Sequence, residues 1–349
     1  MEYQLAGEIE PQVIQRWEAF IAGQKTGSLF QMPLWQDLYN PKTHRWLFFE
    51  GEEKGQIRIV GLIRGRKIPL LGMDCFMERG PVCDDPALLI EGIKAILPLL
   101  KKEKAVRLRL NPYWEYPAGE RLERDLQELG FVTFQGKFES HFETLTIDLQ
   151  KPQEEIFKGL RKDSRWRVKQ SKKIGVSVKP AQSREELESF YQLLTKMSRK
   201  KGMTIPSHFF FLKLWERVLK ESGLGILLLS HYEGRLLSGV IITIHGQRAV
   251  YSWGASETEH LEKVSKNHLV LWEAILWAKG QGCMLFDMGG YAGTRGVNPE
   301  LESIDVFKMS FGGNYCRLIR THFYIFRKNI EKLLEFSSLT RKDLRTKWI

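Results

Sequence analysis

The residue with the clearest chemical potential in this sequence is Lys308, in the segment SIDVFKMSFGG at 303–313. If the segment is helical, Ile304, Phe307, Lys308 and Phe311 share one face, so that a single cation interrupts an apolar stripe. A protonated lysine in a water-poor site can stabilise the oxyanion that develops when a nucleophile attacks a carbonyl carbon. The alternative is a lysine at the edge of the helix face, with its stem over the phenylalanines and its amine in water.

The oxyanion hypothesis requires an acidic neighbour, because burial lowers the pKa of a lysine and only the protonated form can stabilise an anion. Asp287, at the end of LFD, and Asp305 are the acids nearest in sequence that could offset the burial. The sequence has no Gly-x-Ser-x-Gly elbow, no obvious Cys–His pair and no HxxE-type metal site. The spacing of its four cysteines fits neither zinc nor a redox pair, so we expect no bound metal.

A second candidate is a run of positive charge in a chain whose formal net charge is +11. The segment KGLRKDSRWRVKQSKK holds eight basic residues and one acid, while Ile156, Leu160 and Val168 could anchor its other face to the core. Such a helix can follow the phosphate backbone of a nucleic acid, whereas an ordinary solvated helix mixes both signs of charge. The stripe predicted to contact phosphates comprises Lys158, Arg161, Lys162, Arg165, Lys169, Lys172 and Lys173.

Two further groups could line a binding site. Tyr251 and Trp253 are two apart on an expected strand, so we expect them on the same face, where they could wall a groove or pack in the core. Arg295 lies in the glycine-rich loop GGYAGTRG and could bring a guanidinium and backbone amides to a phosphate. The alternative for that loop is a simple surface connection.

The elements that must position these residues form two similar halves. Each half has a strand–turn–strand pair, a long helix and a following strand, at 46–65, 86–104 and 105–112 and again at 224–246, 267–282 and 283–290. The interval from Gly61 to Gly239 equals that from Val106 to Met284. The repeat favours a duplicated α/β unit with mixed sheets covered by helices, and a boundary near 149–152.

The length of 349 residues also favours two domains over one core. No apolar run reaches membrane-spanning length, and the acidic N-terminus lacks the pattern of a signal peptide. We therefore expect a cytoplasmic enzyme or binding protein.

Several stretches together resemble the Fem-type (FemABX) family of peptidoglycan bridge-forming aminoacyltransferases. They are SLFQMPLWQDL, LRKDSRWRVKQSKK, YSWGAS, LVLWEAILWAKGQGC, LFDMGG and VFKMSFGG, in the family's order. The resemblance implies two tandem GNAT-like acyltransferase domains and a C-terminus that returns to the first. We assign residues 1–150 plus 318–349 to the first domain and 151–317 to the second, which carries the catalytic lysine. No sustained heptad is present, so we expect no coiled-coil arm.

The resemblance also implies an activity. Such enzymes take an amino acid, here expected to be a small one such as Gly, Ala or Ser, from aminoacyl-tRNA and attach it to the stem peptide of a cell-wall precursor. Aminoacyl-tRNA is then the co-substrate, with no cofactor, and the precursor is lipid-linked or UDP-linked, with peripheral contact at the inner membrane surface in the first case. By resemblance Lys308 stabilises the transition state with the backbone of Phe307, and Trp35 lies near the acceptor.

Three positions depart from the family pattern. Asp37 stands where close members carry a lysine, and Ile205 where some carry an arginine; both family residues are associated with the acceptor's phosphates. Asn111 stands where a carboxylate is often found. These departures leave the acceptor open.

Two other functions are compatible with the sequence. An acetyl-CoA-dependent GNAT acyltransferase fits the fold, although the pyrophosphate-binding Arg/Gln-x-x-Gly-x-Gly/Ala loop has no strict match. A non-catalytic nucleic-acid-binding protein fits the basic segment alone, and predicts that the amine of Lys308 is dispensable.

Overall fold

The computed structural model describes residues 1–134, 142–202, 204–259, 264–291 and 299–327. The chain divides into two compact units. The first is Met1–Phe142 with the described residues from Arg317 onward, and the second is Glu143–Cys316. None of the helices in the described ranges is both long and apolar enough to cross a membrane.

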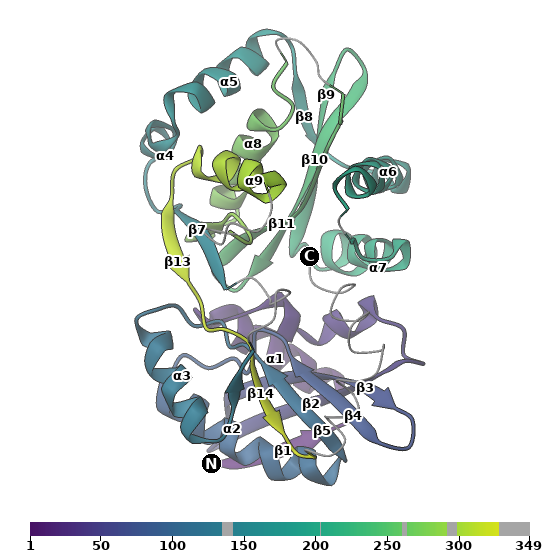
Figure 1. Ribbon diagram of the computed structural model, residues 1–349, viewed down its shortest axis with the longest axis vertical. Coiled ribbons are helices and arrows are strands. Elements are labelled where there is room, and N and C mark those ends of the chain that lie inside the picture. The colour runs from purple at the N-terminus through teal and green to yellow at the C-terminus, as the bar shows by residue number, and fades with distance from the viewer. Residues whose placement is uncertain (135–141, 203, 260–263, 292–298, 328–349) are drawn as a thin grey trace. The chain divides into compact units, whose positions relative to one another are not determined.

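The first unit is built on a mixed seven-stranded sheet (Figure 1). Its strands in spatial order are β1 (Glu2–Ala6), β2 (His44–Glu53), β3 (Gln56–Ile68), β4 (Gly72–Met77), β5 (Ala105–Leu110), β14 (His322–Ile325) and β6 (Val132–Thr133). Its helices are α1 (Pro11–Gly23), the 3₁₀ helices η1 (Leu29–Gln31) and η2 (Pro33–Leu38), α2 (Pro86–Lys102) and α3 (Ala118–Glu128).

The second unit contains another seven-stranded sheet. Its strands in spatial order are β8 (Ser177–Pro180), β9 (Gly225–Tyr232), β10 (Arg235–His245), β11 (Arg248–Ser256), β12 (Leu285–Asp287), β7 (Glu143–Asp148) and β13 (Asn314–Arg317). Its helices are α4 (Gln153–Gly159), α5 (Lys162–Lys173), α6 (Arg184–Lys201), α7 (His208–Lys213), the π-helix η3 (Leu214–Glu221), α8 (His268–Gly280) and α9 (Pro299–Met309).

The two sheets follow the same plan. In each, four antiparallel strands are followed by a parallel pair, β4 with β5 and β11 with β12, and then by an antiparallel strand. Gly61 lies on β3 and Gly239 on the corresponding strand β10. The mixed α/β class predicted from the sequence is confirmed, with the duplication visible in the strand order.

One strand of each sheet comes from the other half of the chain. β7 follows β6 in the sequence but pairs with β12, while β14 follows β13 but lies between β5 and β6. The division between the units therefore falls at 142/143 and not at 150/151, because the hydrogen bonds of β7 are made in the second sheet.

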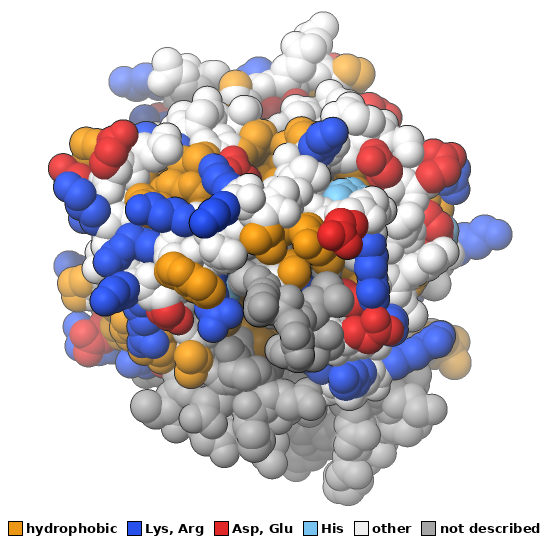
Figure 2. All heavy atoms as spheres, turned by 90° about the horizontal axis from the view of Figure 1, so that it is seen from above, with side chains coloured by type: hydrophobic (Ala, Val, Ile, Leu, Met, Phe, Trp, Pro, Cys, Tyr) orange, Lys and Arg blue, Asp and Glu red, His pale blue; other side chains and the backbone are white. Residues whose placement is uncertain are grey.

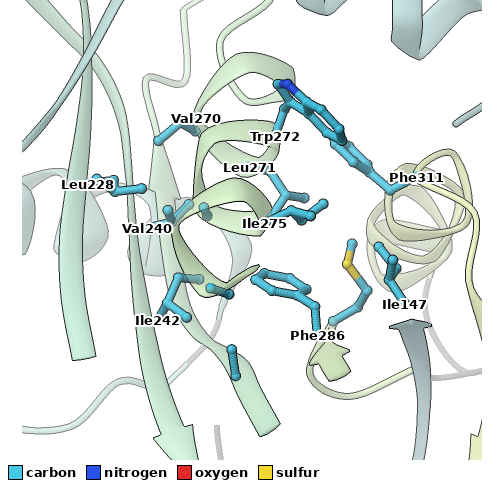
Figure 3. Packing of buried hydrophobic residues seen from close by; sticks show 14 of the residues in the cluster. Ile147, Leu228, Val240, Ile242, Val270, Leu271, Trp272, Ile275, Phe286 and Phe311 are labelled. Carbon is cyan, nitrogen blue, oxygen red and sulfur yellow. The ribbon is translucent and has the colours of Figure 1, made fainter. Parts of the chain in front are cut away.

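The core of the second unit is organised around α8. This helix is apolar on nearly all sides, and Val270, Leu271, Trp272 and Ile275 are almost completely buried. Figure 3 shows Val240 and Ile242 of the sheet on one side of α8 and Phe311, just beyond α9, on another. A helix without a polar face is stable here because the sheet, α5 and the end of α9 surround it.

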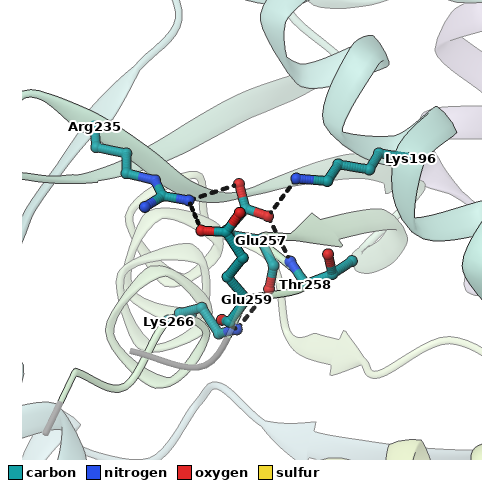
Figure 4. A network of polar contacts seen from close by, with 6 residues as sticks. All are labelled: Lys196, Arg235, Glu257, Thr258, Glu259 and Lys266. Carbon is teal, nitrogen blue, oxygen red and sulfur yellow. Dashed lines mark hydrogen bonds and ion pairs between the residues drawn. The ribbon is translucent and has the colours of Figure 1, made fainter. Parts of the chain in front are cut away.

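The connection from β11 to α8 is held by an ion-pair network (Figure 4). Glu257 accepts from Lys196 at 2.9 Å and pairs with Arg235 at 3.2 Å, and the hydrogen bond from Lys196 is the main reason that the pKa of Glu257 falls to about 2. The Nζ of Lys266 donates to the carbonyls of Glu257 and Glu259, at 2.5 and 2.7 Å. The network fixes the approach to the start of α8.

Candidate active site

Lys308 lies in the last turn of α9, and its amine points into the second unit. The residue is 8% exposed, and its Nζ donates to the carbonyl oxygens of Gly289 and Gly290, the latter at 2.6 Å. The ring of Tyr251 lies 5.9 Å from the same nitrogen. The amine is therefore held among protein groups, and the alternative of a side chain that reaches open water is wrong.

Burial lowers the pKa of Lys308 to about 8, and Asp287 and Asp305 act in the opposite direction. Both acids anticipated from the sequence therefore support the charged form. A lysine with this pKa remains mostly protonated at neutral pH, as the oxyanion hypothesis requires.

Asp287 fixes the turn that holds Lys308. Its Oδ1 accepts from the backbone N–H of Gly289 at 2.8 Å and from the hydroxyl of Thr144 on β7, and its Oδ2 accepts from Arg248 at 3.3 Å. Gly289 has a φ of 63°, and a Cβ there would lie 2.4 Å from the carbonyl oxygen of Tyr251. Only glycine fits this position, and the tight turn directs its carbonyls at the lysine.

Tyr251 and Trp253 do not share a face, contrary to the prediction. Ile241 pairs with Trp253 but the next residue, Ile242, pairs with Tyr251, so the strand bulges at Ser252 and the alternation of side chains is reset. Tyr251 lies on the face of Lys308, where burial raises its pKa to about 12. Trp253 instead packs against Phe210 and Phe211 of the α7 helix, with centroids 5.6 and 5.5 Å apart.

An aromatic group adjoins the end of α9. The ring of Phe307 lies 5.2 Å from His268 and 5.3 Å from Phe311, and its carbonyl accepts from Ser310. Burial lowers the pKa of His268 to about 4, so this imidazole is neutral near pH 7. His268 was not anticipated, because a single histidine at a helix start carries no distinctive sequence signal.

The basic segment forms two helices and not the single one expected. α4 ends at Gly159 and α5 begins at Lys162, because Leu160 and Arg161 are extended. Arg165 closes this break by donating to the carbonyls of Lys158 and Leu160. The predicted anchors are correct, since Ile156, Leu160 and Val168 are all buried.

The cations of this segment are mostly exposed. Lys162, Lys169 and Lys173 follow one side of α5 around Trp166, which is 59% exposed, and Lys158 and Arg161 precede them. Figure 2 shows Lys and Arg side chains gathered on the side of the molecule where α5 lies. The exceptions are the half-buried Arg165 and Lys172, which pairs with Glu273 at 2.8 Å. Arg167, also exposed, was not among the predicted contacts.

The basic segment and the lysine helix are joined by backbone contacts. The N–H of Arg161 donates to the carbonyl of Ser310 at 2.9 Å. A Cβ on Gly312 would lie 2.6 Å from the carbonyl oxygen of Gly159, so the two chains approach as closely as glycine allows. The start of α5 therefore lies directly beside the end of α9.

The remaining predicted residues are elsewhere. Trp35, on η2 of the first unit, is 3% exposed and packs against Phe30 at 4.8 Å, and its contact with an acceptor stays a prediction. Asn111 accepts from the N–H of Arg79 at 2.8 Å, while its buried Nδ2 has no partner. Arg295 lies outside the described residues.

Neither a metal nor a pyrophosphate site is evident from the donor groups. The described ranges hold no cluster of three or more His, Cys, Asp or Glu side chains suited to a metal ion. At the start of α2, the carboxylate of Asp85 accepts from the backbone N–H groups of Ala87 and Leu88, at 2.8 and 3.1 Å. A carboxylate thus already occupies the amides that could otherwise hold a phosphate there.

A GNAT-type sheet with a buried, charge-supported lysine defines an acyltransferase. A sequence model described as "Acetyltransferase (GNAT) domain" matches residues 158–298. The FemAB family model matches residues 14–220, and the chain belongs to this family. It is an aminoacyltransferase with two tandem GNAT-like domains.

Relatives share most of the chain at low identity. The "Lipid II:glycine glycyltransferase" of Staphylococcus haemolyticus (strain JCSC1435) is 22% identical, over 92% of this chain and 93% of its own length. The "UDP-N-acetylmuramoylpentapeptide-lysine N(6)-alanyltransferase" of Weissella viridescens is 23% identical, over 80% and 85%. The crystal structure of FemX matches with a TM-score of 0.83 and 20% identity, over 96% of this chain and 100% of the other.

Proposed function

We propose that this protein transfers an aminoacyl group from aminoacyl-tRNA to an amine on the stem peptide of a peptidoglycan precursor. The observation that carries the proposal is the buried amine of Lys308, which two acids keep charged, beside the basic helix α5. The names of the two relatives, one acting on lipid II and one on a UDP-linked pentapeptide, support this class of acceptor.

The reaction needs no covalent enzyme intermediate, because an aminoacyl ester is already activated. The acceptor nitrogen attacks the ester carbonyl, a C–N bond forms, the C–O bond to the terminal ribose breaks, and a proton passes overall from the amine to the released ribose oxygen. An ammonium group has three donors, and Lys308 uses two of them on Gly289 and Gly290. The third can be directed at the oxyanion.

The donor substrate would be held through its phosphates. The exposed cations of α4 and α5 supply charge without base-reading geometry, and Trp166 offers a face on which a base or ribose can stack. Because the start of α5 adjoins the end of α9, a tRNA acceptor end bound there would lie close to Lys308.

The test is a transfer assay with the full chain. The protein is incubated with a pool of labelled aminoacyl-tRNAs and either a lipid-linked or a UDP-linked pentapeptide, and the acceptor is analysed by mass spectrometry. We expect an added amino acid residue, expected to be small, on one of the two acceptors. If neither acceptor gains mass while acetyl-CoA supports acylation, the protein is a conventional GNAT enzyme and the proposal is wrong.

A further inference from the structure

The hairpin of β3 and β4 in the first unit extends beyond its neighbours (Figure 1). The register pairs Arg66 with His44, the first residue of β2, and Met73 with Ala105, the first residue of β5. Residues 67–72 therefore project past the ends of both adjacent strands. This segment reads KIPLLG, so its tip is apolar.

Leu70 at this tip is in an unfavourable state for a water-exposed turn. Its side chain is 105% exposed, and its φ is 64°, in the left-handed region that favours glycine. Pro69 precedes it, and the N–H of Leu71 donates to the carbonyl of Ile68 at 3.0 Å, which is the pattern of a type II turn. Glycine would suit this position better in water, both in backbone conformation and in exposed apolar area.

Positive charge surrounds the tip. The carbonyl of Lys104 accepts from the N–H of Met73 at 3.1 Å, and the guanidinium of Arg327 donates to the carbonyl of Leu71 at 3.0 Å, so both residues lie at the base of the hairpin. The neighbouring acid Glu103 is paired with Arg45 at 2.7 Å. The exposed cations at this end of the sheet are Lys67, Lys101, Lys102, Lys104 and Arg327.

We propose that this end of the first unit, Lys67–Gly72 with Lys101, Lys102, Lys104 and Arg327, docks on an anionic bilayer surface. Leu70 enters the interfacial layer, and the cations contact lipid headgroups. An apolar tip ringed by cations matches this partner, because apolar insertion and attraction to anionic headgroups act together. The purpose of the surface rests on the proposed function, since a lipid-linked acceptor would be met at a membrane, but binding itself requires no transfer.

The experiment is flotation of the full chain with vesicles at fixed ionic strength and without substrates. Vesicles of phosphatidylglycerol and phosphatidylethanolamine are compared with pure phosphatidylcholine vesicles. We expect binding to the anionic vesicles and a loss of binding in high salt. Leu70→Gly should weaken binding about tenfold, as one inserted leucine predicts, without destabilising the fold. Lys67→Ala with Lys101→Ala and Lys102→Ala should weaken it about 100-fold, or roughly fivefold for each lysine.

Val132→Ser is the matched control, because Val132 is another large apolar side chain of the first unit, 55% exposed, on the edge strand β6. It should bind vesicles as the wild type does. Equal binding by the wild type and Leu70→Gly, or binding that ignores lipid charge, would overturn the proposal. Failure to float with any vesicle would overturn it too, and would make the tip a contact for another protein. A transfer assay on a UDP-linked acceptor, run in parallel, shows separately whether the proposed function fails.

Discussion

Replacing Lys308 by methionine is the most direct test of the site. Methionine keeps the apolar stem and deletes the ammonium group, so the loss should reflect one oxyanion donor. We expect turnover to fall by about 10²- to 10³-fold, or roughly 2.7–4 kcal/mol of transition-state stabilisation. The assay is single-turnover transfer from a labelled aminoacyl-tRNA at saturating acceptor.

The pH dependence separates a charge effect from a packing effect. With a pKa of about 8 the lysine is protonated and active below that pH, and it loses its proton as the pH rises through it. At pH 9 only about one tenth remains charged, so the ratio of wild-type to variant rates should be about tenfold smaller than at pH 7. Taking the ratio cancels the titration of the attacking amine.

The matched control is Lys266→Met. Lys266 also donates to two backbone carbonyls in the second unit, those of Glu257 and Glu259, and burial also lowers its pKa. This variant should lose stability but retain turnover. Equal losses of turnover in both variants, or a rate ratio for Lys308→Met that stays constant from pH 7 to 9, would refute the assignment of Lys308.

Three further predictions concern stability and donor binding. Because folding lowers the pKa of Lys308 from 10.5 to about 8, the unfolded state binds more protons in this window, so the unfolding free energy of the wild type should rise relative to Lys308→Met by about 3 kcal/mol between pH 8 and 10.5 in urea titrations. Gly289→Ala should unfold at lower denaturant than Gly282→Ala, because both positions have positive φ but only the first Cβ meets a backbone oxygen; equal midpoints would contradict the tight turn. Lys162→Ala with Lys169→Ala should reduce the slope of log binding constant for tRNA against log salt by roughly 0.7–0.9 per lost phosphate contact, whereas Lys213→Ala, whose lysine pairs with Glu216, should leave it unchanged. An unchanged slope in the double variant would remove α5 from the donor site.

The sequence allowed the fold class and the central lysine to be predicted because both leave local signals. Alternating and helical periodicities repeat in the two halves, and Lys308 interrupts an apolar stripe that a helix must bury. The acids at 287 and 305 could be anticipated from charge balance alone.

Other features depend on contacts that periodicity does not encode. The bulge at Ser252 moves Trp253 to the opposite face from Tyr251, and a bulge adds one residue without a sequence signature. The break between α4 and α5 follows from packing of Gly159 against Gly312, far along the chain. Arg165 was assigned to phosphates because it falls on the basic stripe, yet its guanidinium closes that break.

The placement of β7 links the repeat architecture to the chemistry. Thr144 on β7 donates to Asp287, and a Cβ on Gly313 would lie 2.9 Å from the carbonyl oxygen of Thr146, so β7 supports both the acid that fixes the 287–290 turn and the glycines that follow α9. β7 follows directly on the strands of the first sheet in the sequence, whereas the corresponding strand β14 comes after the whole second sheet. Lys308 can therefore be held by the 287–290 turn only when a segment at the boundary between the two halves has been added to the second sheet. The exchange of strands makes the lysine site dependent on the tandem arrangement, which a single GNAT-like unit closed by its own last strand would not require.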